Sequence, residues 1–392
     1  MRRIRRLSRV LLTCAVALTL AACSGGGSGL VAPTPAATQS SASPAASAAM
    51  VGVGGGFVCA LTRAGAVRCW GDNSRGQLGD GTTTDRSTPE EVVGLGSGVR
   101  SITAGGSHAC ALTVAGAVRC WGNNDHGQLG DGTTTDRPTP VEVAGLSGVR
   151  SLAAGYGSTC VVDRNRAAKC WGDNHDGQLG DGTNLERLKP APVVGGSGLR
   201  SVAVSYNHAC AQSTTASVSC WGWMSGMTAG GGGEGSTTLS ATPVPVKDMW
   251  AQVRSVAVGS AFSCVLTMGG GVKCWGNNDH GELGINEFSD RETPEDVVGL
   301  GSGLAAVTTG YVHACALTTV GTVRCWGWNK YGQLGDGTTI DRFKPVAVNG
   351  LGNIQSVSAG ESESCAVSLT GTVQCWGRND HGPDDTGDGD AG

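Results

Sequence analysis

The chain has 392 residues, of which 66 are glycine, 15% are charged and 5% are aromatic, and its formal net charge is −4. A modestly acidic chain without a basic stripe is a poor nucleic-acid binder, so no nucleic-acid partner is expected. High glycine content with few aromatic and charged residues is typical of many short strands joined by tight turns.

Residues 1–22 are predicted to form a lipoprotein signal peptide. Five arginines make a basic start, at Arg2, Arg3, Arg5, Arg6 and Arg9. The apolar run Val10–Leu20 is shorter than the roughly 20 residues that a spanning helix needs. It ends in a Leu-Ala-Ala-Cys sequence that resembles a bacterial lipobox, which implies lipidation of Cys23. The alternative is ordinary cleavage at an Ala-x-Ala-like site, which leaves Cys23 free.

Three further segments follow from composition. Residues 23–47 are rich in Gly, Ser, Pro and Ala and lack the apolar content of a core, which predicts a flexible tether. The folded domain is predicted over residues 48–382, and residues 383–392 form an acidic tail that we expect to be disordered. The chain is therefore expected to be exported and lipid-anchored to the bacterial cell envelope or cell surface, with no contact to the membrane beyond that anchor.

Fourteen of the sixteen cysteines fall into seven pairs with the spacing C-x9-C, and each pair is followed directly by Trp-Gly. The pairs are Cys59 with Cys69, Cys110 with Cys120, Cys160 with Cys170, Cys210 with Cys220, Cys264 with Cys274, Cys315 with Cys325 and Cys365 with Cys375. Successive pairs start 50 to 54 residues apart. Self-similarity at this period indicates a solenoid, a propeller or an array.

Each copy contains four short strand patterns separated by glycine-rich turns. They are illustrated by residues 149–154, 108–113, 117–121 and 140–146. The last pattern begins with proline, as an edge strand can. No segment shows a helical period over ten residues. Four short strands per copy, repeated seven times, predict an all-β, seven-bladed β-propeller with four-stranded blades.

The turn between the second and third strands sets the register of the cysteines. Leu112 and Val118 should face each other, which requires a three-residue loop ending in Gly116 as the left-handed bulge residue. This register places Cys110 directly opposite Cys120, within the separation that a disulfide tolerates. Arg166 and Ala216 replace that glycine in copies three and four, so these two copies are expected to turn differently.

Export supplies an oxidising compartment, so each cysteine pair is predicted to form an intrablade disulfide. Paired reduced thiols are the alternative. Zinc is a weaker interpretation, because two cysteines per copy leave half of a tetrahedral site empty. The tryptophan after each pair points to the opposite face of its strand, so we expect it to meet the cystine face of the next blade. These tryptophans are Trp70, Trp121, Trp171, Trp221, Trp275, Trp326 and Trp376.

The best copies of the repeat carry a further motif. It reads GNNDHGQLGDGT at Gly122–Thr133 and GWNKYGQLGDGT at Gly327–Thr338, and a P-x-x-V strand follows. With the cysteine hairpin, this pattern resembles the regulator of chromosome condensation repeat family over about Ala48–Gly382. The resemblance implies a seven-bladed propeller. The family's eukaryotic founder is a nuclear nucleotide-exchange factor, whereas some secreted bacterial relatives bind proteins, including an inhibitor of β-lactamases. Cysteine pairs in every blade are not part of the family pattern and are interpreted as an adaptation to export.

Ring closure is the incomplete part of the pattern. The chain has seven cysteine hairpins but six P-x-x-V strands, so the last blade is expected to have three strands. A segment before the first inner strand, such as Val31–Pro35, is the alternative source of a fourth strand.

Catalytic and cofactor motifs are not found. The sequence has no nucleophile elbow, zinc-binding helix or phosphate loop, so no enzyme activity, cofactor or metal is expected. Asp-Gly turns explain the loops Gly79–Asp85 and Gly130–Asp136 better than calcium does, because their spacing is not that of an EF-hand.

The loop after each first strand varies in sequence, and in a propeller such loops gather on one face around the central channel. Variable aromatic and histidine residues on a rigid frame suit recognition. The partner-binding candidates are Tyr156, Tyr206, Tyr311, His108, His208, His313, Phe57 and Phe262, with the tyrosines favoured over the histidines. Alternatively, the histidines only close their turns by hydrogen bonds to the backbone.

These features predict a monomeric, non-catalytic module at the cell surface that recognises a protein or peptide through one propeller face. The alternative is a carbohydrate or cell-wall binding module, favoured by Trp223, Trp250 and Trp328. A propeller hydrolase is the least favoured function, because it needs a carboxylate cluster in the channel that the sequence does not reveal.

Overall fold

The computed structural model describes residues 40–41, 47–225, 237–249 and 252–379, all of which lie in the unit Ala36–Gly392. The predicted signal peptide, the lipidation site Cys23, the segment Val31–Pro35 and the acidic tail lie outside the described residues. None of the described segments forms an apolar helix with the length needed to cross a membrane.

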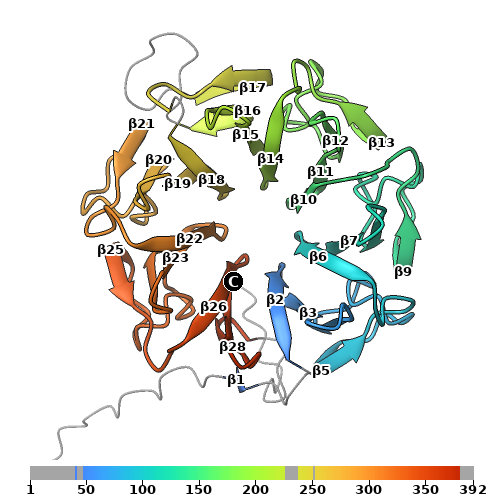
Figure 1. Cartoon of the computed structure of the whole chain (residues 1–392), viewed down its shortest axis with the longest axis horizontal. Helices are drawn as coiled ribbons and strands as arrows, with labels where there is room; N and C mark the ends of the chain where they lie inside the picture. The colour runs from blue at the N-terminus through green and yellow to red at the C-terminus, as the bar shows by residue number, and fades with distance from the viewer. Residues whose placement is uncertain (1–39, 42–46, 226–236, 250–251, 380–392) are drawn as a thin grey trace, which may run out of the picture. The chain divides into compact units, whose positions relative to one another are not determined.

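Seven antiparallel sheets surround a central axis, which confirms the predicted all-β, seven-bladed propeller (Figure 1). The innermost strands are β2 (Ala48–Val53), β6 (Val99–Ala104), β10 (Ser151–Ala154), β14 (Leu199–Val204), β18 (Val253–Val258), β22 (Leu304–Thr309) and β26 (Ile354–Ala359). The second strands are β3 (Phe57–Thr62), β7 (His108–Thr113), β11 (Ser158–Val162), β15 (His208–Ser213), β19 (Phe262–Thr267), β23 (His313–Thr318) and β27 (Glu363–Ser368).

The outer half of each blade is formed by the strands that carry the second cysteine and by the proline-containing strands. The third strands are β4 (Val67–Gly71), β8 (Val118–Gly122), β12 (Ala168–Gly172), β16 (Val218–Ser225), β20 (Val272–Gly276), β24 (Val323–Gly327) and β28 (Val373–Gly377). The outermost strands are β5 (Arg86–Glu91), β9 (Arg137–Glu142), β13 (Arg187–Pro192), β17 (Thr237–Pro245), β21 (Arg291–Asp296) and β25 (Arg342–Ala347).

The last blade has three full strands, β26 to β28, as expected. The two-residue strand β1 (Ser40–Ser41) pairs antiparallel with β28, so a segment that precedes the first inner strand completes this sheet. The first and last parts of the propeller thus meet in one blade.

The predicted hairpin register is observed in every blade. Cys110 lies directly opposite Cys120 across β7 and β8, and the equivalent pairs face each other in the other six blades. Their Cα atoms are 4.0 to 4.1 Å apart, and all seven intrablade disulfides are formed. Cystines of this kind form and persist in an oxidising compartment.

The cystines lie in the interior of the blades. Cys59 is bonded to Cys69, Cys110 to Cys120, Cys160 to Cys170, Cys210 to Cys220, Cys264 to Cys274, Cys315 to Cys325 and Cys365 to Cys375. Among the second cysteines, Cys69, Cys120, Cys170, Cys220, Cys274 and Cys325 are 0% exposed, whereas Cys375 is half-buried. The cystines are therefore structural, since they offer almost no surface to a partner. The alternative of paired reduced thiols is not observed.

The expectation that blades 3 and 4 turn differently between these strands is wrong. Arg166 and Ala216 adopt φ angles of 62° and 63°, whereas Gly116 has a φ of 84° at the same position of blade 2. The three-residue turn is therefore kept, and the two non-glycine residues accept the left-handed conformation. The outermost strand also starts earlier than expected, at Arg137 instead of Pro140.

Each cystine shares a buried apolar cluster with the tryptophan of the blade that follows it in the chain. Trp121 of blade 2 packs with the cystine of Cys59 and Cys69 in blade 1, and the same arrangement recurs at the next five seams. Trp70 of blade 1 packs with the cystine of Cys365 and Cys375 in blade 7, which closes the ring. The layered stack is confirmed, but its direction is the reverse of the one expected: each tryptophan packs with the cystine of the blade before it, not of the next blade.

Candidate partner-binding face

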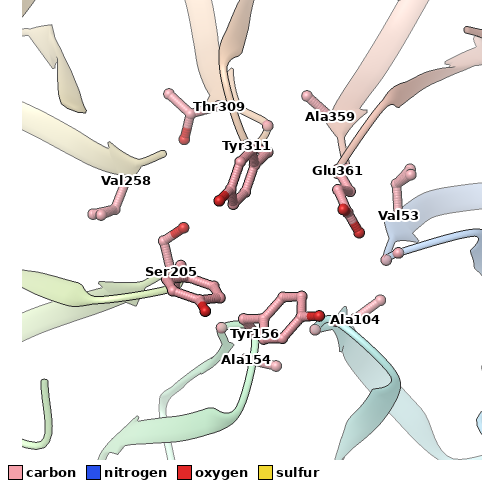
Figure 2. A pocket seen from close by; sticks show the side chains of 18 of the residues that line it. Val53, Ala104, Ala154, Tyr156, Ser205, Val258, Thr309, Tyr311, Ala359 and Glu361 are labelled. Carbon is pink, nitrogen blue, oxygen red and sulfur yellow. The ribbon is translucent and has the colours of Figure 1, made fainter. Parts of the chain in front are cut away.

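The loops that join the first and second strands surround one mouth of the central channel (Figure 2). They enclose a cavity of about 110 Å³. Its wall is formed by the small or apolar residues that end the inner strands, Val53, Ala104, Ala154, Val204, Val258, Thr309 and Ala359. Because this wall offers few polar groups, the chemistry of the mouth depends on the loop side chains.

Three tyrosines stand around this cavity. Tyr156, Tyr206 and Tyr311 are 50%, 42% and 37% exposed. The ring centroids of Tyr156 and Tyr206 are 4.9 Å apart, and those of Tyr206 and Tyr311 are 6.1 Å apart with nearly perpendicular planes. The tyrosines of blades 3, 4 and 6 thus form one cluster, which presents both ring surface and hydroxyl groups to solvent.

Glu361 of blade 7 supplies a carboxylate to the same cavity (Figure 2). Burial raises the pKa of the Tyr156 hydroxyl, and the negative charge of Glu361 and the two neighbouring tyrosines raises it further. Glu361 was not among the predicted site residues. It nevertheless occupies the same repeat position as the three tyrosines, two residues after the last residue of the inner strand. We call Tyr156, Tyr206, Tyr311 and Glu361 the tyrosine mouth.

Backbone hydrogen bonds fix the loops of the tyrosine mouth to one another. The Tyr156 amide donates to the Ser205 carbonyl at 3.2 Å, and the Tyr311 amide donates to the Gly360 carbonyl at 3.1 Å. The Glu361 amide in turn donates to the Gly54 carbonyl of blade 1 at 3.3 Å. Such bonds between blades hold the side chains on a frame that is set before a partner arrives, which reduces the ordering cost of binding.

The prediction that the histidines and phenylalanines contact a partner is corrected by their burial. His108, His208 and His313 are at most 3% exposed, and Phe57 and Phe262 are at most 2% exposed. All five occupy the first position of the second strand, one residue past the loop, where the side chain turns into the seam between blades. A side chain without accessible surface cannot contact a partner.

The histidines link neighbouring blades. Nε2 of His108 lies 2.9 Å from Oγ1 of Thr159 in blade 3, and this hydroxyl donates to the carbonyl of Gln128. Because the hydroxyl proton is used on that carbonyl, Nε2 must carry the ring proton. His208 and His313 make the same bond to the hydroxyls of Ser263 and Ser364. Burial lowers the pKa of each of the three histidines to about 4, so they are neutral at pH 7.

The Asp-Gly loops are held by internal hydrogen bonds. One oxygen of Asp131 accepts bonds from the amide and hydroxyl of Thr133 at 2.9 and 2.7 Å, and the other accepts a bond from Arg137 Nε at 2.9 Å. Burial raises the pKa of Asp131, but the bonds from Thr133, Arg137 and Asn124 outweigh that effect and lower it. Asp80, Asp181 and Asp336 have the same arrangement with Arg86, Arg187 and Arg342. These contacts explain the loops without calcium.

The two described tryptophans of the carbohydrate interpretation lie in different blades. Trp223 and Trp328 are half-buried and belong to blades 4 and 6, and Trp250 lies outside the described residues. Trp328 packs against Tyr331, with ring centroids 5.5 Å apart.

The sequence of the repeats identifies the family. Profiles of the regulator of chromosome condensation (RCC1) repeat match residues 64–112, 115–162, 170–212, 270–317 and 321–367. The chain belongs to the RCC1 repeat family. A second RCC1 repeat profile matches five overlapping segments, from residues 99–128 to 354–382. This membership agrees with the seven-bladed ring and with the resemblance seen in the repeat motif.

Curated relatives with RCC1-type similarity are much longer than the matched region. The chain is 30% identical over 265 residues to the ultraviolet-B receptor UVR8 of Arabidopsis thaliana, which covers 67% of this chain and 49% of that protein. It is 32% identical over 292 residues to the human E3 ubiquitin-protein ligase HERC2, which covers 74% of this chain and 5% of HERC2. The chain thus spans about half or less of these relatives.

Solved structures share the fold. Yeast RCC1 (Prp20), solved bound to Kap60, superposes with a TM-score of 0.71 at 23% identity, covering 83% of this chain and 79% of Prp20. Human WBSCR16 superposes with a TM-score of 0.71 at 21% identity, covering 86% and 87% of the two chains.

Proposed function

We propose that this RCC1-repeat propeller is a non-catalytic module at the bacterial cell surface that binds a protein or peptide through the tyrosine mouth. The cluster of three exposed tyrosine rings with a carboxylate over one end of the channel carries this proposal. Tyrosine is enriched where interfaces gain most of their binding energy, because it offers a rigid, amphipathic surface at low entropic cost.

The chemistry of the mouth favours a partner that inserts a positively charged side chain. The faces of the tyrosine rings attract cations, and each such contact contributes about 0.5–1 kcal/mol at exposed sites. Glu361 places a carboxylate in the same cavity as Tyr156, where its negative charge adds to the effect of burial in raising the pKa of that hydroxyl. A lysine or arginine side chain of a protein or peptide would satisfy both features.

The comparisons support binding in preference to catalysis. Prp20 was solved bound to Kap60, and a second study describes its binding to Gsp1p and histones. The ligase activity named for HERC2 belongs to a protein of which this chain matches 5%. Of the described residues that line the cavity, Glu361 alone has a carboxylate, whereas the paired-carboxylate mechanism of glycoside hydrolysis needs two.

The proposed location is supported by the cystines and by the leader sequence. Seven disulfides indicate an oxidising compartment outside the cytoplasm. The basic leader and the lipobox-like sequence before Cys23 support export and anchoring through a lipid. Metabolic labelling with an alkyne fatty acid tests the anchor, since Cys23→Ala should abolish the label.

The binding proposal is tested by surface cross-linking of the intact lipoprotein, followed by affinity measurement with the identified partner. Replacing Tyr156, Tyr206 and Tyr311 together with alanine should weaken binding at least about tenfold. Glu361→Gln should weaken binding and reduce its dependence on salt. Tyr331→Ala is the matched control, because Tyr331 lies outside the cavity lining, and it should leave affinity unchanged.

Two results would contradict the proposal. The first is a partner whose affinity is the same for the triple variant and for the wild type, with both proteins folded by circular dichroism. The second is binding to a glycan array that disappears in Trp223→Ala or Trp328→Ala but survives the triple tyrosine substitution. That second result would favour the carbohydrate alternative.

A further inference from the structure

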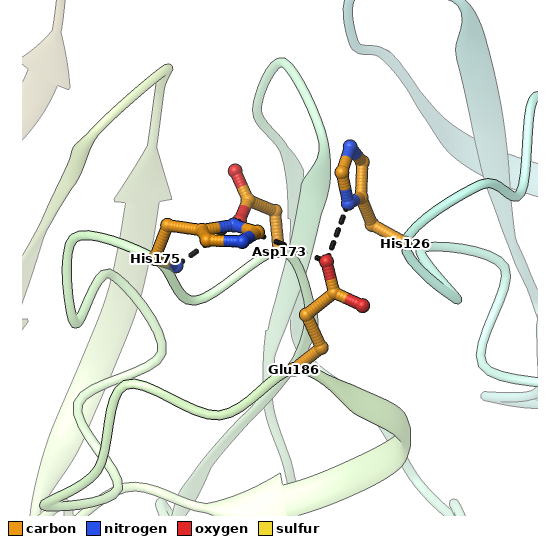
Figure 3. Close-up of side chains that lie close together, drawn as sticks. All are labelled: His126, Asp173, His175 and Glu186. Carbon is orange, nitrogen blue, oxygen red and sulfur yellow. Dashed lines mark hydrogen bonds and ion pairs between the residues drawn. The ribbon is translucent and has the colours of Figure 1, made fainter.

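Four potential metal ligands meet on the seam between blades 2 and 3 (Figure 3). His126 lies in the loop after β8, Asp173 and His175 lie in the loop after β12, and Glu186 directly precedes β13. One ligand atom from each side chain lies within 4.8 Å of the others. The fold thus gathers residues that are up to 60 positions apart in the chain.

The nitrogen atoms of both imidazoles face carboxylates. His126 Nδ1 lies 2.5 Å from Glu186 Oε1, and His175 Nδ1 lies 2.6 Å from Asp173 Oδ1 and 3.9 Å from Glu186 Oε1. Glu186 therefore lies between the two rings, whose centroids are 6.0 Å apart. A proton holds each histidine–carboxylate contact in the absence of metal, and a divalent cation can replace both protons.

Two other seams have a contact between a basic and an acidic side chain at the same repeat positions, but without the full set of four ligands. His280 contacts Asp341 of the next blade at 2.8 Å, and Arg75 contacts Asp136 at 3.2 Å. His280 and Arg75 occupy the repeat position of His126, and Asp341 and Asp136 occupy that of Glu186. Arg75 also contacts Asp125, at the repeat position of His175, at 3.3 Å. The seam of blades 2 and 3 adds His175 and Asp173 to that basic–acidic pair, and no other group of three or more such ligands was found among the described residues.

The donor set selects the class of metal. Two imidazole nitrogens and two carboxylate oxygens suit zinc and the neighbouring divalent transition metals, whereas calcium prefers oxygen donors only. Zinc binds such ligands at about 2.0–2.2 Å, so the four side chains must move inward from their present positions. They are able to do so because their exposed fractions range from 22% for Asp173 to 70% for His175.

We propose that His126, Asp173, His175 and Glu186 bind one divalent transition-metal ion of the zinc class, which clamps blade 2 to blade 3. The site lies beside the tyrosine mouth. Gly157, the residue after Tyr156, is so close that a Cβ atom there would be 3.3 Å from Asp173 Cβ and 3.5 Å from His126 Cδ2. The metal would therefore brace the loop that presents Tyr156. This inference does not depend on the proposed function, because the ligands are independent of any partner.

The test is calorimetric titration of Zn²⁺ into the chelator-treated protein, purified without a polyhistidine tag. The wild type should bind one ion per chain and should unfold at a higher temperature with Zn²⁺ than without it. His126→Ala, His175→Ala and Glu186→Gln should each weaken binding at least about tenfold. Cobalt should give the visible spectrum of a site with nitrogen and oxygen ligands, and the variants should lose it.

His280→Ala is the matched control, because it removes one histidine from a similar seam that lacks the two extra ligands. It should leave zinc affinity unchanged. Thermal unfolding in the presence of chelator checks that each variant is folded. If an alanine variant does not fold, Glu186→Gln still tests the site, because glutamine keeps the shape of the glutamate side chain. Absence of saturable zinc binding in the wild type would overturn the proposal. The proposal would also be overturned if His280→Ala and His175→Ala lost the same zinc affinity, or if the wild type bound calcium as tightly as zinc.

Discussion

Glu282 occupies a buried position where copies one, two, three and six of the repeat carry glutamine, and its replacement by glutamine should stabilise the protein in a pH-dependent way. Its side chain is 0% exposed. Glu282 Oε2 accepts a hydrogen bond from the amide of His280 at 2.8 Å, just as Gln77 Oε1 accepts one from the amide of Arg75 at 2.8 Å. Glu282→Gln therefore keeps the contact that shapes the loop and removes only the titrating group.

The magnitude follows from the shift in the Glu282 pKa. Burial raises it from 4.5 to about 7, against smaller opposing effects from backbone hydrogen bonds and from His280. The folded chain thus holds this proton more tightly than the unfolded chain does. The stability from the neutral carboxyl is fully present below pH 4.5 and is lost as the pH rises to about 7. Above that pH the charged, buried carboxylate costs the wild type about 3 kcal/mol.

Urea unfolding of the oxidised protein at pH 4, 6 and 8 measures this effect. Glu282→Gln and the wild type should have similar stability at pH 4, and the variant should be more stable by about 3 kcal/mol at pH 8. Gln333→Glu, at the same position of blade 6, is the reverse control. It should lower the free energy of unfolding, and this loss of stability should also grow as the pH rises. A stability difference that does not change between pH 4 and pH 8 would refute the explanation.

Two other predictions concern the seams and the turns. The buried histidines take up protons below about pH 6.5 when unfolded but only near pH 4 when folded, so the stability that they contribute should be lost as the pH falls from about 6.5 to about 4. His313→Gln should reduce the slope of urea midpoint against pH, and an unchanged slope would argue against this linkage. Arg166→Gly and Ala216→Gly should each raise stability by about 0.5–1 kcal/mol, because relief of the left-handed conformation exceeds the entropic cost of glycine. Thermal unfolding measures this gain, and a lower midpoint in both variants would contradict it.

The fold was predictable because a single local rule is repeated seven times. The spacing between the two cysteines and the glycine of the turn define a register, and that register places the sulfur atoms together in each blade. The prediction was wrong where it treated glycine as a requirement of the turn. Arg166 and Ala216 were expected to change the turn, but the disulfide and the flanking strands keep it and hold both residues at positive φ.

The candidate site was predictable only in part, because its residues belong to different copies of the repeat. The loop position identified the three tyrosines, whereas the buried histidines needed a comparison between neighbouring copies. A hydroxyl residue precedes the first cysteine only in copies three, five and seven, at Thr159, Ser263 and Ser364. Each of these copies follows one that contains a histidine. That alternation is the signal for a buried histidine–hydroxyl bond across a seam.

The tyrosine mouth exists only while the ring is closed, because its side chains come from blades 3, 4, 6 and 7. The cystines lie within blades and do not join neighbours, so the seams depend on the tryptophan stack, on backbone hydrogen bonds between loops and, at three seams, on the histidine–hydroxyl bonds. At the closing seam, Trp70 and Cys375 are half-buried, whereas Trp121 and Cys69, the equivalent residues between blades 2 and 1, are 0% exposed. The outer strand there is only two residues long. Local opening should therefore begin between blades 7 and 1, next to Glu361, because the least buried contacts of a structure open at the lowest free energy.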